Sequence, residues 1–142
     1  MRVDNIISPV TIGSPTGILF YLETPFWQKG VTIKRKDDGM TCSSTNSTSN
    51  CTSSEFSITT ERRGNGLLVN LTTQSVTCRD AGEYVCISVN DPSATVVANL
   101  EVIGNTFVTL YTCSTFSSKL YTYLKCRFVE CAVLAIKNTI LI

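Results

Sequence analysis

The chain has 142 residues, with twelve lysines and arginines against eleven aspartates and glutamates, and it contains no histidine. This length fits one ordinary domain, and the formal charge of +1 lacks the single-sign excess expected of a protein that binds nucleic acid or a membrane surface. The absence of histidine excludes Ser-His-Asp and Cys-His nucleophile activation and histidine metal ligation. Charged residues make up only 16% of the chain, so polarity rests on Ser, Thr and Asn, which favours extracellular β-structure over a cytosolic helical enzyme.

Short β-like segments separated by turn residues fill residues 6–103, and no helical apolar period is sustained there. The sequence therefore predicts an all-β domain. We expect strands at Ile18–Leu22, Phe26–Lys34, Phe56–Thr60, Leu67–Thr73, Glu83–Val89 and Thr95–Val102. Because Gly, Pro, Asn and Asp tolerate turn geometry, we expect turns at Gly13–Pro15, Asp37–Gly39, Gly64–Gly66 (a hairpin turn) and Asn90–Pro92.

Two kinds of polar stretch interrupt this pattern. Residues 41–60 hold thirteen Ser or Thr in twenty positions, which predicts a solvated loop or an irregular edge. The basic clusters Lys34–Lys36 and Arg62–Arg63 stand beside acidic residues, and we interpret them as solvated turns.

Seven cysteines, at positions 42, 51, 78, 86, 113, 126 and 131, are many for a cytosolic chain of this size. The sequence has no C-x-x-C pair and no histidine, so a zinc site would need four thiolates. Disulfides are therefore the main expectation. An odd number of cysteines leaves at least one thiol unpaired or bonded between chains.

The two ends of the chain carry no readable targeting signal. Residues 1–25 lack the apolar run of a secretory signal peptide, and charged residues interrupt the apolar positions near the C-terminus, so no transmembrane helix is expected. Either the chain is a fragment whose leader and anchor lie outside it, or the cysteine content misleads about the compartment. Net charge turns from negative to positive after Gly104. We place the domain at 1–104, possibly incomplete at its N-terminus, and expect 105–142 to be a disordered, extended or partly helical tail.

The most specific string in the chain is Asp80-Ala81-Gly82-Glu83-Tyr84-Val85-Cys86. Gly82 permits a tight bend before a strand. Tyr84 and Cys86 are two residues apart, so both face the same interior side, and the Tyr84 hydroxyl can bond back to the corner. In the preceding strand every second side chain would face the same core, if Cys86 does. These residues are Val69, Leu71 and Thr73.

This string resembles the D-x-G-x-Y-x-C signature of the immunoglobulin superfamily, in its variable-type or I-set-like domains. Trp27 resembles the strand C tryptophan of that family, at a separation from Cys86 that is typical of variable-type domains. The resemblance covers residues 6–103 and implies an immunoglobulin-like antiparallel β-sandwich, with Cys86 buried and inert beside Trp27. The implied core signature is Trp27, Asp80, Gly82, Tyr84 and Cys86.

The chain departs from the family pattern in two ways. No cysteine precedes position 42, so the strand B partner of Cys86 is missing. Either an apolar residue such as Ile18 or Phe20 fills that place, or the true strand B is lost from this chain. Variable domains often carry a basic residue at the start of strand D, which pairs with the aspartate of the signature. Glu55 stands there instead, so Asp80 needs another partner or bonds to backbone amides.

The resemblance also implies a disulfide. Cys78 would lie at the corner between strands E and F, close to the start of strand D, which Cys51 precedes. We therefore expect Cys78 to be bonded to Cys51 or, less favourably, to Cys42. The competing pair, Cys42 with Cys51, would only pin a local loop.

Three asparagines begin N-glycosylation sequons: Asn46, Asn50 and Asn70. These matter only if the chain enters the secretory pathway. A bonded Cys51 would block or slow modification of Asn50, whereas the strand phase turns Asn70 outward.

An immunoglobulin-like fold implies no particular chemistry, and the sequence offers no plausible nucleophile–base pair. We therefore expect no enzyme, cofactor or metal. The leading interpretation is an extracellular recognition or adhesion glycoprotein, either the ligand-binding part of a cell-surface receptor or a secreted binder. The alternatives are an intracellular structural module of the muscle-filament kind and a cysteine-based metal or redox protein.

The strand period also predicts a partner face on the F-G-C sheet. If Tyr84 and Cys86 point inward, alternate side chains point outward and form an apolar row that solvent disfavours. A protein ligand or a second copy of the chain would dock there, unless the 105–142 tail covers it. We expect no nucleic-acid partner, and contact with a membrane only through an anchor outside this chain. The predicted face is Phe26, Gln28, Val85, Ile87 and Val89.

Overall fold

In the computed structural model the described residues are 1–37, 39–104 and, for the backbone alone, 112–113. Their elements in chain order are β1 (Arg2–Ile6), β2 (Val10–Thr11), β3 (Thr16–Glu23), β4 (Val31–Arg35), β5 (Thr41–Ser44), β6 (Ser49–Cys51), β7 (Phe56–Arg63), β8 (Gly66–Thr73), the 3-10 turn η1 (Cys78–Asp80), β9 (Gly82–Ser88), β10 (Thr95–Leu100), β11 (Val102–Ile103) and β12 (Thr112–Cys113).

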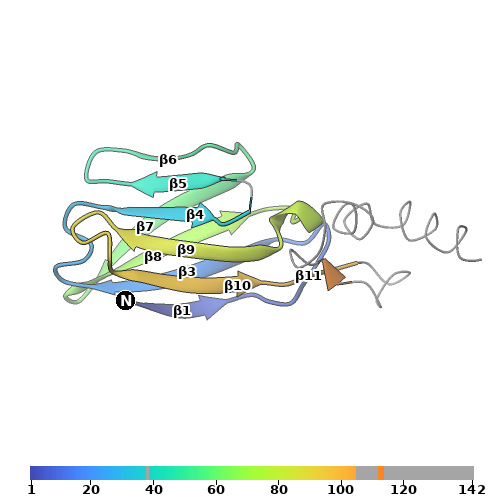
Figure 1. Cartoon of the computed structure of the whole chain (residues 1–142), viewed down its shortest axis with the longest axis horizontal. Helices are drawn as coiled ribbons and strands as arrows, with labels where there is room; N and C mark the ends of the chain where they lie inside the picture. Colours follow the sequence, from blue (N-terminus) through green and yellow to red (C-terminus); the bar gives the residue numbers. More distant parts are fainter. Residues whose placement is uncertain (38, 105–111, 114–142) are drawn as a thin grey trace, which may run out of the picture.

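Two antiparallel sheets form the two layers of the molecule (Figure 1). The four-stranded sheet has the order β1-β3-β8-β7, and the five-stranded sheet has the order β10-β9-β4-β5-β6. Lettered along the chain, this strand order matches the A-B-E-D and G-F-C-C′-C″ order known from variable-type immunoglobulin sandwiches. The fold is immunoglobulin-like, as the sequence predicts.

A third, small sheet has the order β12-β11-β2. Strand β2 runs parallel to β11, and β12 runs antiparallel to it, with Cys113 opposite Val102. Backbone pairing therefore resumes beyond Gly104, where the sequence analysis places the domain boundary. The sequence analysis expects 105–142 to be a disordered, extended or partly helical tail. Apart from β12, these residues lie outside the described part of the chain.

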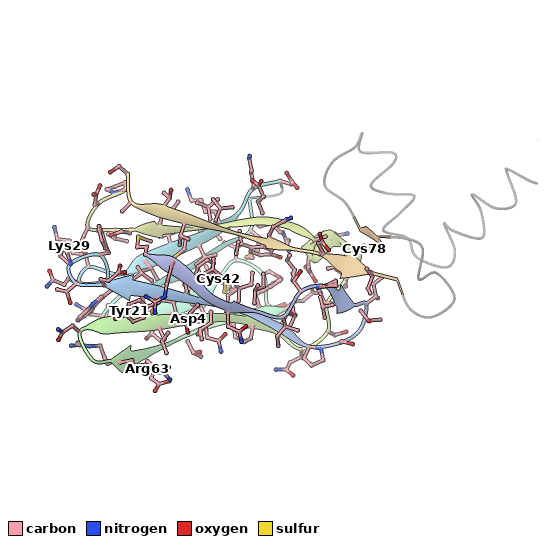
Figure 2. The ribbon with its side chains drawn as sticks, turned by 90° about the horizontal axis from the view of Figure 1, so that it is seen from below. Asp4, Tyr21, Lys29, Cys42, Arg63 and Cys78 are labelled. Carbon is pink, nitrogen blue, oxygen red and sulfur yellow. A yellow bond between two sulfur atoms is a disulfide. The ribbon has the colours of Figure 1, made fainter. Side chains whose placement is uncertain are left out.

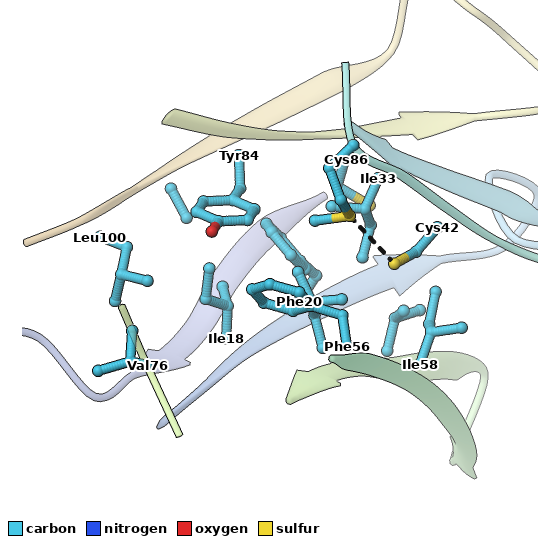
Figure 3. Packing of buried hydrophobic residues seen from close by; sticks show 14 of the residues in the cluster. Ile18, Phe20, Ile33, Cys42, Phe56, Ile58, Val76, Tyr84, Cys86 and Leu100 are labelled. Carbon is cyan, nitrogen blue, oxygen red and sulfur yellow. Dashed lines mark hydrogen bonds between the residues drawn. The ribbon is translucent and has the colours of Figure 1, made fainter. Parts of the chain in front are cut away.

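Alternate residues of facing strands fill the core. In β3 the side chains of Ile18 and Phe20 are almost fully buried, and Val69 and Leu71 are buried in the paired strand β8. Figure 3 shows Ile18 and Phe20 among the packed apolar side chains. Strand β3 is thus present and buries apolar side chains, which agrees with the first of the two alternatives given for the missing strand B cysteine. Full burial of each such side chain is worth about 1.5–3 kcal/mol.

The bend from η1 into β9 depends on Tyr84 and Asp80. Gly82 has a φ of 136°, which residues with a Cβ rarely adopt, so the chain can turn sharply there. The buried Tyr84 hydroxyl donates a hydrogen bond to the backbone oxygen of Asp80. The Asp80 carboxylate accepts a hydrogen bond from the Thr77 N–H at 2.8 Å. These contacts confirm the predicted return of the tyrosine side chain to the corner.

Asp80 also has an ionic partner, Arg35 of β4. The Arg35 Nη1 donates to Asp80 Oδ1 at 2.8 Å, and the two side chains are only 5% and 2% exposed. The same nitrogen lies 3.3 Å from the Tyr84 hydroxyl. The interpretation of Lys34–Lys36 as a solvated turn is therefore wrong at its central residue. Burial alternates along β4, so Arg35 points inward toward the corner while its neighbour Lys34 faces solvent.

Strand β4 begins at Val31, later than the predicted Phe26. Residues 24–29 form turns instead, closed by backbone hydrogen bonds that each span three residues. Pro25 has no N–H for a strand ladder. Gly30 ends the turn with a φ of 112°, and a Cβ there would lie 2.5 Å from the Ser44 backbone oxygen. The local sequence thus excludes a strand over residues 24–30.

Trp27 is consequently not a strand C core residue, and that prediction is wrong. It lies half-buried in the turn. The Arg62 guanidinium carbon is 4.0 Å from the centroid of its ring, and its Nε1 donates a hydrogen bond to the Asn65 backbone oxygen at 3.1 Å. Ile33 takes the place directly opposite Cys86 in the sheet. Trp27 instead ties the 24–29 turn to the hairpin between β7 and β8.

The Ser- and Thr-rich stretch forms the hairpin of β5 and β6 at the edge of the five-stranded sheet. Cys42 and Cys51 lie directly opposite each other in this hairpin and are joined by a disulfide. The predicted bond from Cys78 to Cys51 is therefore wrong, because the register places Cys51 against its hairpin partner. Cys78 is disulfide-bonded as well, but not to the other cysteines with described side chains. Figure 2 shows it well away from Cys42, toward one end of the sandwich.

Candidate functional site

The outer face of the five-stranded sheet carries apolar side chains on neighbouring strands. Buried and half-buried positions alternate along β9, so Val85 and Ile87 face outward. The register sets Val97 of β10 opposite Val85. Val97 is 50% exposed, and Val89, just after β9, is 42% exposed. We call Val85, Ile87, Val89 and Val97 the apolar face.

Polar and charged side chains border the apolar face. Thr32 and Thr95 flank Ile87 on either side across the sheet. Lys34 is exposed beside Val85. A sheet that faces water on one side usually alternates apolar and polar residues, whereas β9 also has the apolar side chains of Val85 and Ile87 on its outward side, after Glu83. An apolar centre with a polar rim is the usual anatomy of a protein–protein interface.

The charges near this face have mixed sign. Lys36 Nζ and Glu83 Oε2 lie 3.1 Å apart, with side chains 67% and 46% exposed. Such an exposed ion pair contributes little to stability. The rim therefore favours neither a strongly acidic nor a strongly basic partner.

Two of the five residues predicted for the partner face lie elsewhere. Phe26 and Gln28 belong to the 24–29 turn, where Phe26 packs against the core and Gln28 is exposed. The prediction placed them on the sheet because it extended strand C too far toward the N-terminus. The sequence analysis also missed Val97, although the period of two along residues 95–102 was the signal that could have found it.

The three sequon asparagines lie on different parts of the surface. Asn46 is exposed in the turn between β5 and β6, and its amide donates to the Gln28 backbone oxygen at 3.4 Å. Asn50 is exposed in β6, next to the bonded Cys51. Asn70 is half-buried on β8 and faces outward from the four-stranded sheet, as its strand phase predicts.

Cys86 is a buried free thiol, as predicted. Burial raises the pKa of this thiol from 9.0 to about 12, which suppresses the reactive thiolate at neutral pH. The predicted neighbour Trp27 is replaced by Ile33. Among residues 1–37 and 39–104, no group of histidine, cysteine, aspartate or glutamate side chains is arranged to hold a metal ion. In the part of the chain that the structure describes, no helix is long and apolar enough to span a membrane.

No protein-family model matches the chain, and no curated protein matches it. Among the solved structures that resemble it is the crystal structure of the ZIG-8 IG1 homodimer. That chain is 14% identical, and the match covers 72% of this chain and 87% of that one with a TM-score of 0.49. The immunoglobulin-like assignment rests on the strand order and the corner geometry described above.

Proposed function

We propose that the protein is a non-enzymatic recognition or adhesion module that binds a protein partner through the apolar face. The observation that carries the proposal is the outward position of Val85, Ile87 and Val97 on two adjacent strands. Exposed clusters of apolar side chains with a polar border commonly mark interaction sites. A protein partner would remove these side chains from water, which is the main driving force of most protein association.

The disulfides support an extracellular or cell-surface setting. Cys42 is bonded to Cys51, and Cys78 is bonded too, and such bonds persist in oxidising compartments. In that setting the module would serve as the ligand-binding part of a receptor or as a secreted binder. An intracellular structural module would keep these thiols reduced. Alkylation of the natural protein without reduction, followed by peptide mapping, distinguishes the two settings. Alkylated Cys42 and Cys51 would show free thiols and would overturn the extracellular setting.

A binding screen tests the function itself. The full chain, multimerised to raise its avidity, is applied to a panel of cell-surface and secreted proteins that includes the chain itself. We expect saturable binding to at least one protein of the panel, resistant to removal of nucleic acid. Retention only by nucleic acid or lipid, or by no protein of a broad panel, would contradict the proposal.

A further inference from the structure

The outer face of the four-stranded sheet, on the opposite side of the sandwich from the apolar face, contains a hollow of about 310 Å³. Strands β1, β3 and β8 contribute to its lining, which includes Asn5, Ile7, Leu19, Asn70 and Thr72. Ile7 is 55% exposed. The hollow therefore combines apolar walls with asparagine and threonine side chains.

Gly17 of β3 is part of the lining of the hollow. Gly17 pairs with Thr72, and Leu19 pairs with Asn70. A Cβ at Gly17 would lie 3.3 Å from Asn70 Oδ1 and 3.3 Å from Thr72 Cγ2, closer than ordinary van der Waals contact. The Asn70 and Thr72 side chains therefore lie close over Gly17, and all three residues belong to the lining of the hollow.

Asn70 and Thr72 are also the two functional positions of one glycosylation sequon. They are two residues apart in a strand, so both side chains project from the same face. Both are half-buried at the hollow, whereas Leu71 between them points into the core. A sugar attached to Asn70 would thus begin inside the hollow and pass over Leu19 and Ile7.

We propose that Asn70 carries an N-linked glycan whose first sugar occupies this hollow and shields the outer face of the four-stranded sheet. The inference rests on the proposed extracellular function, and it explains why partners would dock on the other sheet. In the transfer, Asn70 Nδ2 forms a bond to the anomeric carbon of a lipid-diphosphate-linked oligosaccharide. The bond from that carbon to the diphosphate oxygen breaks, and the amide nitrogen loses one proton.

The other two sequons provide contrasts within the same chain. Asn46 lies in an exposed turn and does not line the hollow beside Asn70. Asn50 stands beside Cys51, which is bonded within its own hairpin. A glycan on Asn46 would extend into solvent. Removing it therefore shows how the loss of a glycan changes stability when no sugar packs against the protein.

The experiment uses the full chain secreted behind a heterologous signal peptide from cells that make only high-mannose glycans. Variants Asn70→Gln and Thr72→Ala each remove one sequon, and Asn46→Gln is the matched control. We expect both Asn70-sequon variants to lose the mass of one glycan. We also expect their Tm to fall by several degrees, whereas Asn46→Gln leaves it unchanged. Trimming the wild-type glycans to the first sugar should preserve the Tm.

Two results would overturn the inference. An unchanged mass in Asn70→Gln and Thr72→Ala would show that the site is unoccupied. A lost glycan with the Tm of the Asn46→Gln control would show that the sugar does not pack in the hollow. Neither readout involves the apolar face or a partner, so failure here is distinguishable from failure of the proposed function.

Discussion

Arg35 and Asp80 place opposite charges inside the sandwich, at the corner that Tyr84 also contacts. Removing two charges from water is costly, and the pair is stable because each group satisfies the other and because Asp80 also accepts from the Thr77 N–H. The acidic half of this pair was visible in the sequence motif. Its basic half was not, because in a single sequence Arg35 looks like the middle of a solvated basic cluster.

Replacing Arg35 with methionine should destabilise the domain strongly. The variant Arg35→Met keeps a long apolar side chain but leaves Asp80 as an unpaired buried charge, which we expect to cost about 3–5 kcal/mol. The matched control Lys36→Met breaks the exposed pair with Glu83 and should cost less than about 1 kcal/mol. Urea unfolding measures both, and equal losses in the two variants would contradict the structural role of Arg35.

Cys86 should make stability depend on alkaline pH. The folded pKa of about 12 exceeds the ordinary value of 9.0, so above pH 9.0 the unfolded chain releases a proton that the folded chain retains. The contribution of Cys86 is therefore complete below pH 9.0 and is lost as the pH rises toward 12. The free energy of unfolding of the wild type should fall more steeply in this range than that of Cys86→Ala. Parallel pH profiles would show that the thiol is exposed in the folded state.

At the scale of elements, the alternating strands could be predicted because their side chains have a period of two. Strands β3, β8 and β9 lie where that period indicates. The 24–29 turn could not be predicted in this way, because Phe26 and Trp27 look like strand residues in sequence. Their conformation depends on Pro25 and Gly30, and on contacts with a hairpin distant in the chain. The same holds for Cys51, whose partner follows from the hairpin register.

Gly30 provides a test of the turn that sets the start of β4. Alanine at Gly30 would meet both a φ of 112° and a Cβ distance of 2.5 Å to the Ser44 backbone oxygen. Gly39 is the matched control, since its φ is 74° and a Cβ there meets nothing within 4 Å. The control should cost about 1–2 kcal/mol from backbone strain alone, and Gly30→Ala clearly more. If chemical denaturation finds the two equally stable, the close approach of the turn to β5 is wrong.

At the scale of the whole molecule, the sandwich has two outer faces of different character. The five-stranded sheet exposes an apolar face, and the four-stranded sheet has a hollow beside Asn70. The sequence predicted the first through Val85, Ile87 and Val89, because outward positions follow from the inward phase of Tyr84 and Cys86. It could not predict the hollow, because the residues that line it come from strands far apart in the chain.

The most direct test of recognition through the apolar face compares two lysine substitutions on opposite sheets. Ile87→Lys places a charge in the centre of the apolar face, and Thr59→Lys places one at an exposed position of β7. The measurement is the Kd of each variant for the partner found in the binding screen, with the Tm recorded on the same samples. We predict that Ile87→Lys weakens binding at least about tenfold, equivalent to about 1.4 kcal/mol, with a nearly unchanged Tm, and that Thr59→Lys binds like the wild type. Unchanged binding by Ile87→Lys, or unfolding of that variant because another segment of the chain covers the face, would contradict the account.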